Sequence, residues 1–330
     1  CVVHAGRPQA RVLASSSRFC CFFQPMFLPP RNPTIFHILF SLRGSIASKI
    51  WRRVAYTMLL SVLVNFTHGE VYDHKVTLTP TAFTIMGLTL AIFLGFRNTA
   101  SYDRFWEGRK LWGEMLITCR NLARQFITLP RSPRGEATRQ RVYLAIAFAY
   151  ALKNQLRGKD PTADLTPLLP PELLQKVLAA PNRPTAILME LGHASRELGE
   201  EGLDPQLVAR VDHEVGALSH VLGGCERIQS TPIPYTYVLP LHRTVHIYCF
   251  LLPFALIDTI GYLTPVIVGV VSYTFFGLDA LGDEIADPFD EEPNDLPLDA
   301  ISRTIDINLR AQLGETDLPE PVQPKDGVLL

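Results

Sequence analysis

The apolar positions of the chain gather into three long stretches, at residues 54–66, 81–96 and 235–281. A helix needs about 20 residues to cross the hydrocarbon core of a bilayer. The first stretch reaches that length only together with the preceding "SLRGSIASKIW", which leaves Arg52 and Arg53 near the membrane interface or facing protein. The second stretch suffices by itself, and the third is long enough for two spans broken at "IDTIGYLTP". The pattern therefore predicts four transmembrane helices.

The region between the second and third stretches has the period of packed helices. In "RKLWGEMLITCRNLARQFITL" one stripe is apolar, and charged residues lie off it. Further helices are expected at about 138–157, 170–179, 184–199 and 205–229, and a short one at "AISRTIDINLRAQLGE". We therefore expect an all-α membrane protein, with four transmembrane helices per subunit and a cytosolic helical domain.

The predicted domains follow from these elements. They are an N-terminal extension (1–31), spans one and two (32–100), a cytosolic helical domain (101–230), spans three and four (231–283), and an acidic segment with a short helix and tail (284–330). Lysine and arginine are concentrated before span one and after span two, whereas the hairpin between these spans has one lysine and two acids. Because positive charge favours the cytoplasmic side, we expect both termini there.

The first 31 residues hold four arginines, no acid and a serine cluster, a composition typical of an organellar transit segment. They start without Met and end in proline-rich sequence, which favours a disordered extension. The expected location is therefore a bacterial inner or plasma membrane, and an organelle membrane is the alternative if the segment is a transit signal.

Composition narrows the function. The 330 residues are 47% hydrophobic and 19% charged with a net charge of −1, which suits a chain that is part membrane and part water-exposed and does not suggest nucleic acid. The six cysteines show no CxxC spacing, so we interpret them as reduced thiols and expect no zinc. No nucleophile, base and orienting acid occur at a recognisable spacing, so we predict no catalytic residue and no enzyme activity.

Span two carries two helical stripes. Small residues at every fourth position would let helices approach closely, and the next stripe is bulky and apolar. If several copies surrounded an axis, the bulky stripe would form stacked rings over about 12 Å, a constriction that opens by wetting. Alternatively, the bulky stripe faces lipid or core. The two stripes are Gly87, Ala91 and Gly95, and Leu88, Ile92 and Phe96.

Directly after span two, "FRNTASYDRFWEGRKLWG" is dense in ions. We call its members Arg97, Asp103, Arg104 and Glu107 the neck-edge ionic cluster. Oppositely charged residues a turn apart can pair on a helix. A belt of interfacial side chains that extend to the lipid headgroups explains the same pattern without a special role.

Four ordered segments resemble the bestrophin family, also called the RFP-TM chloride channel family, and in particular its prokaryotic-type branch. They are "FLGFRNTASYDRFWEGRKLWG", "ERIQSTPIPYTYVLPLHR", "LTPVIVGVVSYTFFGLDALGDEIADPF" and "PNDLPLDAISRTIDINL". The resemblance implies a homopentameric channel with one axial pore, narrowed at a neck in span two and again at a cytosolic aperture. Animal bestrophins are calcium-activated chloride channels, whereas prokaryotic-type relatives favour cations.

The resemblance also implies site residues. The neck falls on Leu88, Ile92 and Phe96, and the aperture on Gln206 or its neighbours Leu207 and Val208. The animal calcium clasp corresponds to an acidic segment here whose run of acids is interrupted by proline and asparagine. Its acids are Asp290, Glu291, Glu292 and Asp295. Since calcium needs six to eight oxygens from a loop that can wrap it, we expect no calcium gating and no cofactor, and prefer a solvated linker that meets arginines of a neighbouring subunit.

The interpretation is a homopentameric channel in the lipid bilayer that passes small monovalent ions. Chloride is the family label and sodium or potassium is the alternative, because an apolar neck does not set the sign of the ion. A membrane-anchored scaffold or sensor without conductance is the rival class. His242 and His246 are spaced for a metal, but no third ligand lies at a suitable spacing, so we assign them packing or hydrogen-bonding roles and predict no metal site.

Overall fold

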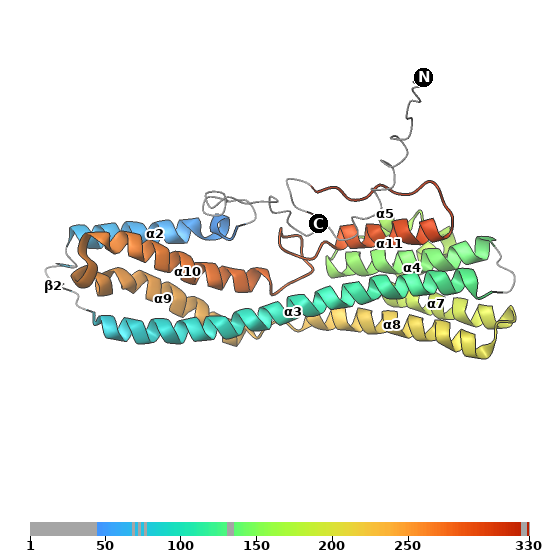
Figure 1. Ribbon diagram of the computed structural model, residues 1–330, viewed down its shortest axis with the longest axis horizontal. Helices are drawn as coiled ribbons and strands as arrows, with labels where there is room; N and C mark the ends of the chain where they lie inside the picture. The colour runs from blue at the N-terminus through green and yellow to red at the C-terminus, as the bar shows by residue number, and fades with distance from the viewer. Residues whose placement is uncertain are drawn as a thin grey trace, which may run out of the picture.

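The computed structural model describes residues 45–67, 70–71, 74–75, 78–130, 135–324 and 329. The predicted N-terminal extension lies outside the described residues. The molecule is elongated, with one helical bundle at each end and a single long helix, α3, running through both (Figure 1).

The first bundle is built from four helices. They are α2 (Ala47–Phe66), the N-terminal half of α3 (Pro80–Thr128), α9 (Tyr235–Ile260) and α10 (Thr264–Glu284). A minimal antiparallel pair of strands, β1 (Glu70–Val71) and β2 (His74–Lys75), connects α2 to α3, and a short 3-10 turn, η2 (Gly261–Leu263), connects α9 to α10. Gly261 has a φ of 64°, a conformation that glycine adopts without steric cost.

The second bundle contains the C-terminal half of α3 and most of the remaining helices. These are α4 (Gly135–Leu156), α5 (Thr162–Leu165), α6 (Pro171–Ala179), α7 (Arg183–Glu200), α8 (Pro205–Ser230) and α11 (Leu298–Gln312). Five of the helices, α4, α6, α7, α8 and α11, lie close to the ranges expected from the sequence. The one-turn helix α5 lies in a stretch expected to be a loop, and its shortness explains why no periodic signal marked it.

Each bundle has its own apolar core. The core of the first includes Leu94 from α3, Val245 from α9 and Val268 from α10, all fully buried. The core of the second centres on Trp112 of α3 and Phe148 of α4, which are also fully buried. Helix α3 therefore contributes to both cores.

Helix α3 continues without interruption for 49 residues. It begins with Pro80, a residue suited to the first helical turn because that position needs no N–H donor. At 1.5 Å per residue its length is about 73 Å, more than twice the thickness of a bilayer core. Residues 100 and 101, the expected boundary between span two and the cytosolic helical domain, lie inside this helix.

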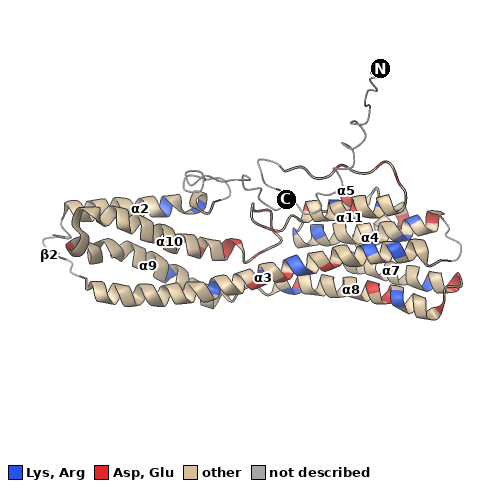
Figure 2. Ribbon diagram, in the orientation of Figure 1, with Lys and Arg blue, Asp and Glu red and all other residues tan. Residues whose placement is uncertain are grey.

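The surface of the first bundle is apolar over most of its length. Lysine, arginine, aspartate and glutamate are concentrated at its inner end and over the second bundle (Figure 2). Large side chains on all four helices of the first bundle are exposed, among them Tyr56, Ile92, Phe250 and Val270. An exposed apolar area of this extent indicates contact with lipid or with other protein.

Within the described residues, two helical stretches are long and apolar enough to cross a membrane, Pro80–Thr128 and Tyr235–Glu284. The second stretch contains α9, η2 and α10. Helix α2 does not meet the same criteria, and it carries Lys49, Arg52 and Arg53 in its first two turns.

Candidate functional site

Three apolar side chains of α3 point away from the body of the chain. Leu88 is 64% exposed, Ile92 49% and Phe96 64%, and we call them the neck face. Leu90 and Leu94, on the opposite side of the same helix, are 3% and 0% exposed because they pack in the first core. The neck face therefore has no cover from its own chain among the described residues.

The small-residue stripe divides into two environments. A Cβ placed on Gly87 would lie 2.7 Å from the hydroxyl oxygen of Tyr248, so this glycine allows α9 to approach α3 closely. A Cβ placed on Gly95 would meet nothing within 4 Å. Packing within the chain therefore explains the need for glycine at position 87 but not at position 95.

Arg97 binds two carboxylates of α10. Its Nη1 donates to Oδ1 of Asp279 at 2.7 Å, and its Nη2 donates to Oδ1 of Asp283. The neighbouring Asn98 donates from Nδ2 to the carbonyl of Leu278 at 3.0 Å. Arg97 is 1% exposed, so it is part of a buried contact between α3 and α10 and does not extend along the membrane interface.

His242 of α9 completes this contact. Its Nδ1 lies 2.7 Å from Oδ2 of Asp279, and its Nε2 lies 3.5 Å from Oδ1 of Asp283. His246, one turn on, contacts the carbonyl of His242 through Nδ1 and the ring of Phe276. Sequence reasoning missed Asp279 and Asp283 as partners of His242. The available signal was a carboxylate, Asp279, within the apolar sequence of the last span.

The other members of the neck-edge ionic cluster bind elsewhere. Arg104 donates to the backbone carbonyls of Ala286, Ile228 and Thr231, which ties α3 to the ends of α8 and α10. Glu107 pairs with Arg227, and Asp103 is exposed. Among the described contacts, no two members of the cluster pair with each other. The dense ions thus fasten α3 to α8 and α10 and do not form a local network.

The three aperture candidates occupy the first turn of α8. The N-cap Asp204 accepts a hydrogen bond from the backbone N–H of Gln206 at 2.8 Å. Gln206 is exposed and Leu207 is 38% exposed, whereas Val208 packs against the second core. Gln206 and Leu207 are therefore the two that face outward.

The acidic segment is held by cations of its own chain. Glu291 pairs with Arg157 and Lys159, and Glu292 pairs with Lys49. Asp290 accepts from the backbone N–H of Glu291, and Asp295 accepts from that of Glu292. Both glutamates of the candidate clasp are thus neutralised by basic side chains, and this arrangement does not fit a calcium ion, which needs uncommitted oxygens. We expected these acids to meet arginines of a neighbouring subunit, but the arginine that pairs with Glu291 is Arg157 of the same chain.

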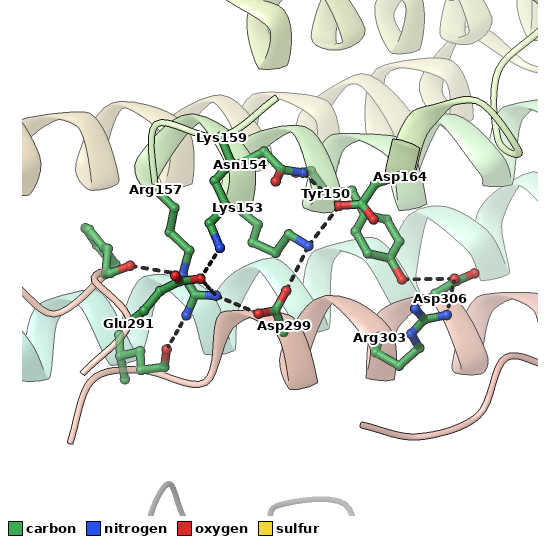
Figure 3. Close-up of polar contacts among 12 residues, drawn as sticks. Tyr150, Lys153, Asn154, Arg157, Lys159, Asp164, Glu291, Asp299, Arg303 and Asp306 are labelled. Atoms are coloured by element: carbon green, nitrogen blue, oxygen red, sulfur yellow. Dashed lines mark hydrogen bonds and ion pairs between the residues drawn. The ribbon is translucent and has the colours of Figure 1, made fainter. Parts of the chain in front are cut away.

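Arg157, the residue directly after α4, holds this segment through several contacts (Figure 3). Its side chain is 1% exposed and donates to Oδ2 of Asp299 at 2.7 Å. It also donates to the carbonyls of Phe289, Asp290 and Leu296. Lys153 joins the same network through Asp299 at 2.8 Å, and these two cations lower the pKa of Asp299 against the opposing effect of burial. The segment is therefore fixed to α4 and α11.

Burial raises the pKa of Asp295 to about 7, and the nearby carboxylates of Glu292, Asp290 and Asp287 add to the effect. Asp295 is 3% exposed. This carboxyl group therefore exchanges its proton near neutral pH, whereas an exposed aspartate does so near pH 4.

Comparison with known proteins gives consistent matches. A sequence model of the family described as "Bacterial/Fungal Bestrophin protein" matches residues 26–311. A voltage-dependent anion channel-forming protein of Ralstonia nicotianae is 40% identical over 296 residues, covering 89% of this chain and 97% of that protein. The voltage-dependent anion channel-forming protein YneE of Escherichia coli K12 is 43% identical over 294 residues, covering 87% and 94%. The crystal structure of a bacterial bestrophin homologue from Klebsiella pneumoniae, in a single-substitution variant, is 42% identical with a TM-score of 0.78 and covers 81% of this chain and 100% of that one.

Proposed function

This chain belongs to the bacterial and fungal bestrophin family, and we propose that it forms an ion channel that carries small monovalent anions such as chloride across a bacterial inner membrane. In this proposal α2, the N-terminal half of α3, α9 and α10 cross the bilayer, both termini are cytoplasmic, and five copies surround one axial pore. The second bundle then forms the cytosolic part.

The observation that carries the proposal is the exposure of the neck face. Leu88, Ile92 and Phe96 are turned outward from a bundle whose remaining surface is also apolar. A ring of such faces around a common axis forms a constriction of hydrophobic side chains that conducts when water enters it. Arg97, on the opposite side of α3, fixes the helix to its own subunit.

The sign of the ion is proposed from the relatives, whose names describe anion channels. A neck of three apolar side chains does not distinguish chloride from sodium or potassium, so charges at the two mouths set the preference. A sodium- or potassium-selective channel of the same architecture is the alternative. The reversal potential of reconstituted protein under a salt gradient separates the two, because its sign reports which ion carries the current.

The experiment uses purified protein in liposomes with a chloride gradient. Ile92→Ala shortens the neck side chain, and we expect the rate of ion flux to rise by about tenfold, which corresponds to about 1.4 kcal/mol in the barrier. Ile117→Ala is the matched control, because Ile117 lies on the same helix and is 60% exposed but lies beyond the first bundle. Mass measurement in detergent should give five copies.

Two results would contradict the proposal. Liposomes that pass no ions with either the unsubstituted protein or Ile92→Ala would favour a membrane-anchored scaffold or sensor. An equal change of flux in Ile92→Ala and Ile117→Ala would remove the neck face from the ion pathway.

A further inference from the structure

Behind the neck face lies a cluster of charged groups from three helices, buried at Arg97 and Asp279 and open to solvent at Asp283. It consists of Arg97 from α3, Asp279 and Asp283 from α10, and His242 from α9. The side chains of Arg97 and Asp279 are 2% and 0% exposed. Phe96 directly precedes Arg97 and is 64% exposed, whereas Arg97 is 1% exposed, because successive residues of a helix point about 100° apart and Arg97 is turned into the bundle. The cluster therefore attaches the part of α3 that bears the neck face to α9 and α10.

The cluster has one negative charge too many when His242 is neutral. One guanidinium faces two carboxylates, and imidazolium would bring the sum to zero. Other groups close to it are His246, the amide of Asn98 and the thiol of Cys249. Asp283 also lines an open pocket of about 240 Å³, whose charged residues are Lys49, Arg53, Glu284, Asp287, Asp290, Glu292 and Asp295. Acidic residues outnumber Lys49 and Arg53 in this pocket, so it adds no net positive charge to balance the cluster.

The geometry shows what a proton on His242 changes. A carboxylate only accepts hydrogen bonds, so Nδ1 of His242 must carry the hydrogen that Asp279 receives at 2.7 Å. In the neutral ring Nε2 is then a bare acceptor, and it lies 3.5 Å from an oxygen of Asp283, which is also an acceptor. In the imidazolium ring Nε2 carries a hydrogen and attracts that oxygen. One proton thus converts a repulsive contact into an attractive one.

A metal ion fits this cluster less well than a proton. The side chains of His242, Asp279 and Asp283 bring one nitrogen and two oxygens within 4.8 Å of one another. The guanidinium of Arg97 already occupies one oxygen of each carboxylate. A cation would have to lie beside that positive charge, whereas imidazolium forms from a group that is already in place.

We propose that His242 is a positioning residue, whose protonation tightens the attachment of α10 to the back of α3 and so makes flux through the neck depend on pH. The inference rests on the proposed channel function. His242 lies on α9, whereas the neck face lies on α3, so its protonation would act on the neck through the packing of the helices. Unperturbed histidine is the side chain that changes charge between about pH 5 and 8.

The test compares flux into liposomes with the same buffer on both sides at pH 5.5 and at pH 8. For the unsubstituted protein we expect the two rates to differ by about fivefold, the lower end of measured couplings between sites. His242→Gln keeps a hydrogen-bond donor for Asp279 but cannot be protonated, so the difference should disappear. His246→Gln is the matched control and should keep it, because His246 contacts a carbonyl and an aromatic ring rather than the carboxylates.

A second measurement, thermal unfolding of the same variants at both pH values, does not require conduction. The unsubstituted protein and His246→Gln should melt higher at pH 5.5 relative to pH 8 than His242→Gln does. Equal pH responses of flux in His242→Gln and the unsubstituted protein would overturn the inference, as would flux that does not change between the two pH values. If no variant passes ions, the proposed channel function fails, and a melting difference that depends on His242 would still show the proton-dependent attachment.

Discussion

The contact between Gly87 and Tyr248 allows a sharp test of how the neck helix is packed. Replacing Gly87 with alanine would place a Cβ 2.7 Å from the hydroxyl oxygen of Tyr248 and 3.2 Å from its ring carbon Cζ. The first distance is too short for a real contact, so α3 and α9 must separate or the tyrosine must move. We expect Gly87→Ala to destabilise the first bundle and Tyr248→Phe to rescue it.

The magnitude follows from two opposing effects. Overpacking costs about 1–3 kcal/mol, and alanine in the interior of a helix gains about 1 kcal/mol over glycine. Gly87→Ala should therefore lower stability by about 1 kcal/mol. When Tyr248→Phe removes the hydroxyl, the nearest atom is the ring carbon at 3.2 Å, which needs only a small adjustment. The double variant should then be at least as stable as Tyr248→Phe alone, with a coupling energy of about 1–2 kcal/mol.

The assay is thermal unfolding of the four proteins of this double-mutant cycle in one detergent at one scan rate. Such a cycle isolates the pairwise interaction if each single change introduces no new one. Gly95→Ala serves as a comparison, because a Cβ there meets nothing within 4 Å of its own chain. If Tyr248→Phe fails to rescue Gly87→Ala, the close approach of α9 at Gly87 does not explain the need for glycine.

Three further predictions concern the stability of the fold. Gly282→Ala should lower the unfolding temperature, because its Cβ would overlap the side-chain oxygen of Asn98 on α3. Gly192→Ala, where a Cβ meets nothing within 4 Å, should raise stability by about 1 kcal/mol. Arg157→Met should cost about 1–3 kcal/mol in unfolding experiments, because the carbonyl oxygen of the buried Phe289 loses its donor while Asp299 keeps Lys153. Lys159→Met, at an exposed ion pair, should cost under about 1 kcal/mol. The raised pKa of Asp295, about 7, means that the folded state keeps a proton that the unfolded state releases above about pH 4. Stability should therefore fall as pH rises from about 4 to 7, and Asp295→Asn should raise the unfolding temperature at pH 8 but not at pH 4.

The sequence predicted most of the helices, because their apolar stripes recur with the helical period and prolines or glycines separate them. It also predicted that Leu88, Ile92 and Phe96 share one face of α3. It did not predict which side of α3 would be covered, because periodicity identifies a stripe without naming its partner. The structure shows that the covered side is that of Leu90, Leu94 and Arg97.

The ionic contacts were the least accessible to sequence reasoning. Arg97 and Asp279 are 182 positions apart, and Glu291 and Arg157 are 134 apart. Opposite charges near one another in sequence, such as Arg104 and Glu107, suggested local pairs, but Glu107 instead binds Arg227 of α8. Long-range pairing of ions depends on the packing of helices, which a single sequence does not display.

Helix α3 supplies Leu94 to one core and Trp112 to the other with no loop between them. A soluble fragment made by cutting the chain before residue 101 would retain Trp112 but begin in mid-helix, with its first N–H groups lacking acceptors. Conversely, a fragment that ended there would leave the anchoring Arg104 behind. Because one uninterrupted helix enters both cores, a rotation of the second bundle about the axis of α3 would be transmitted to the first bundle.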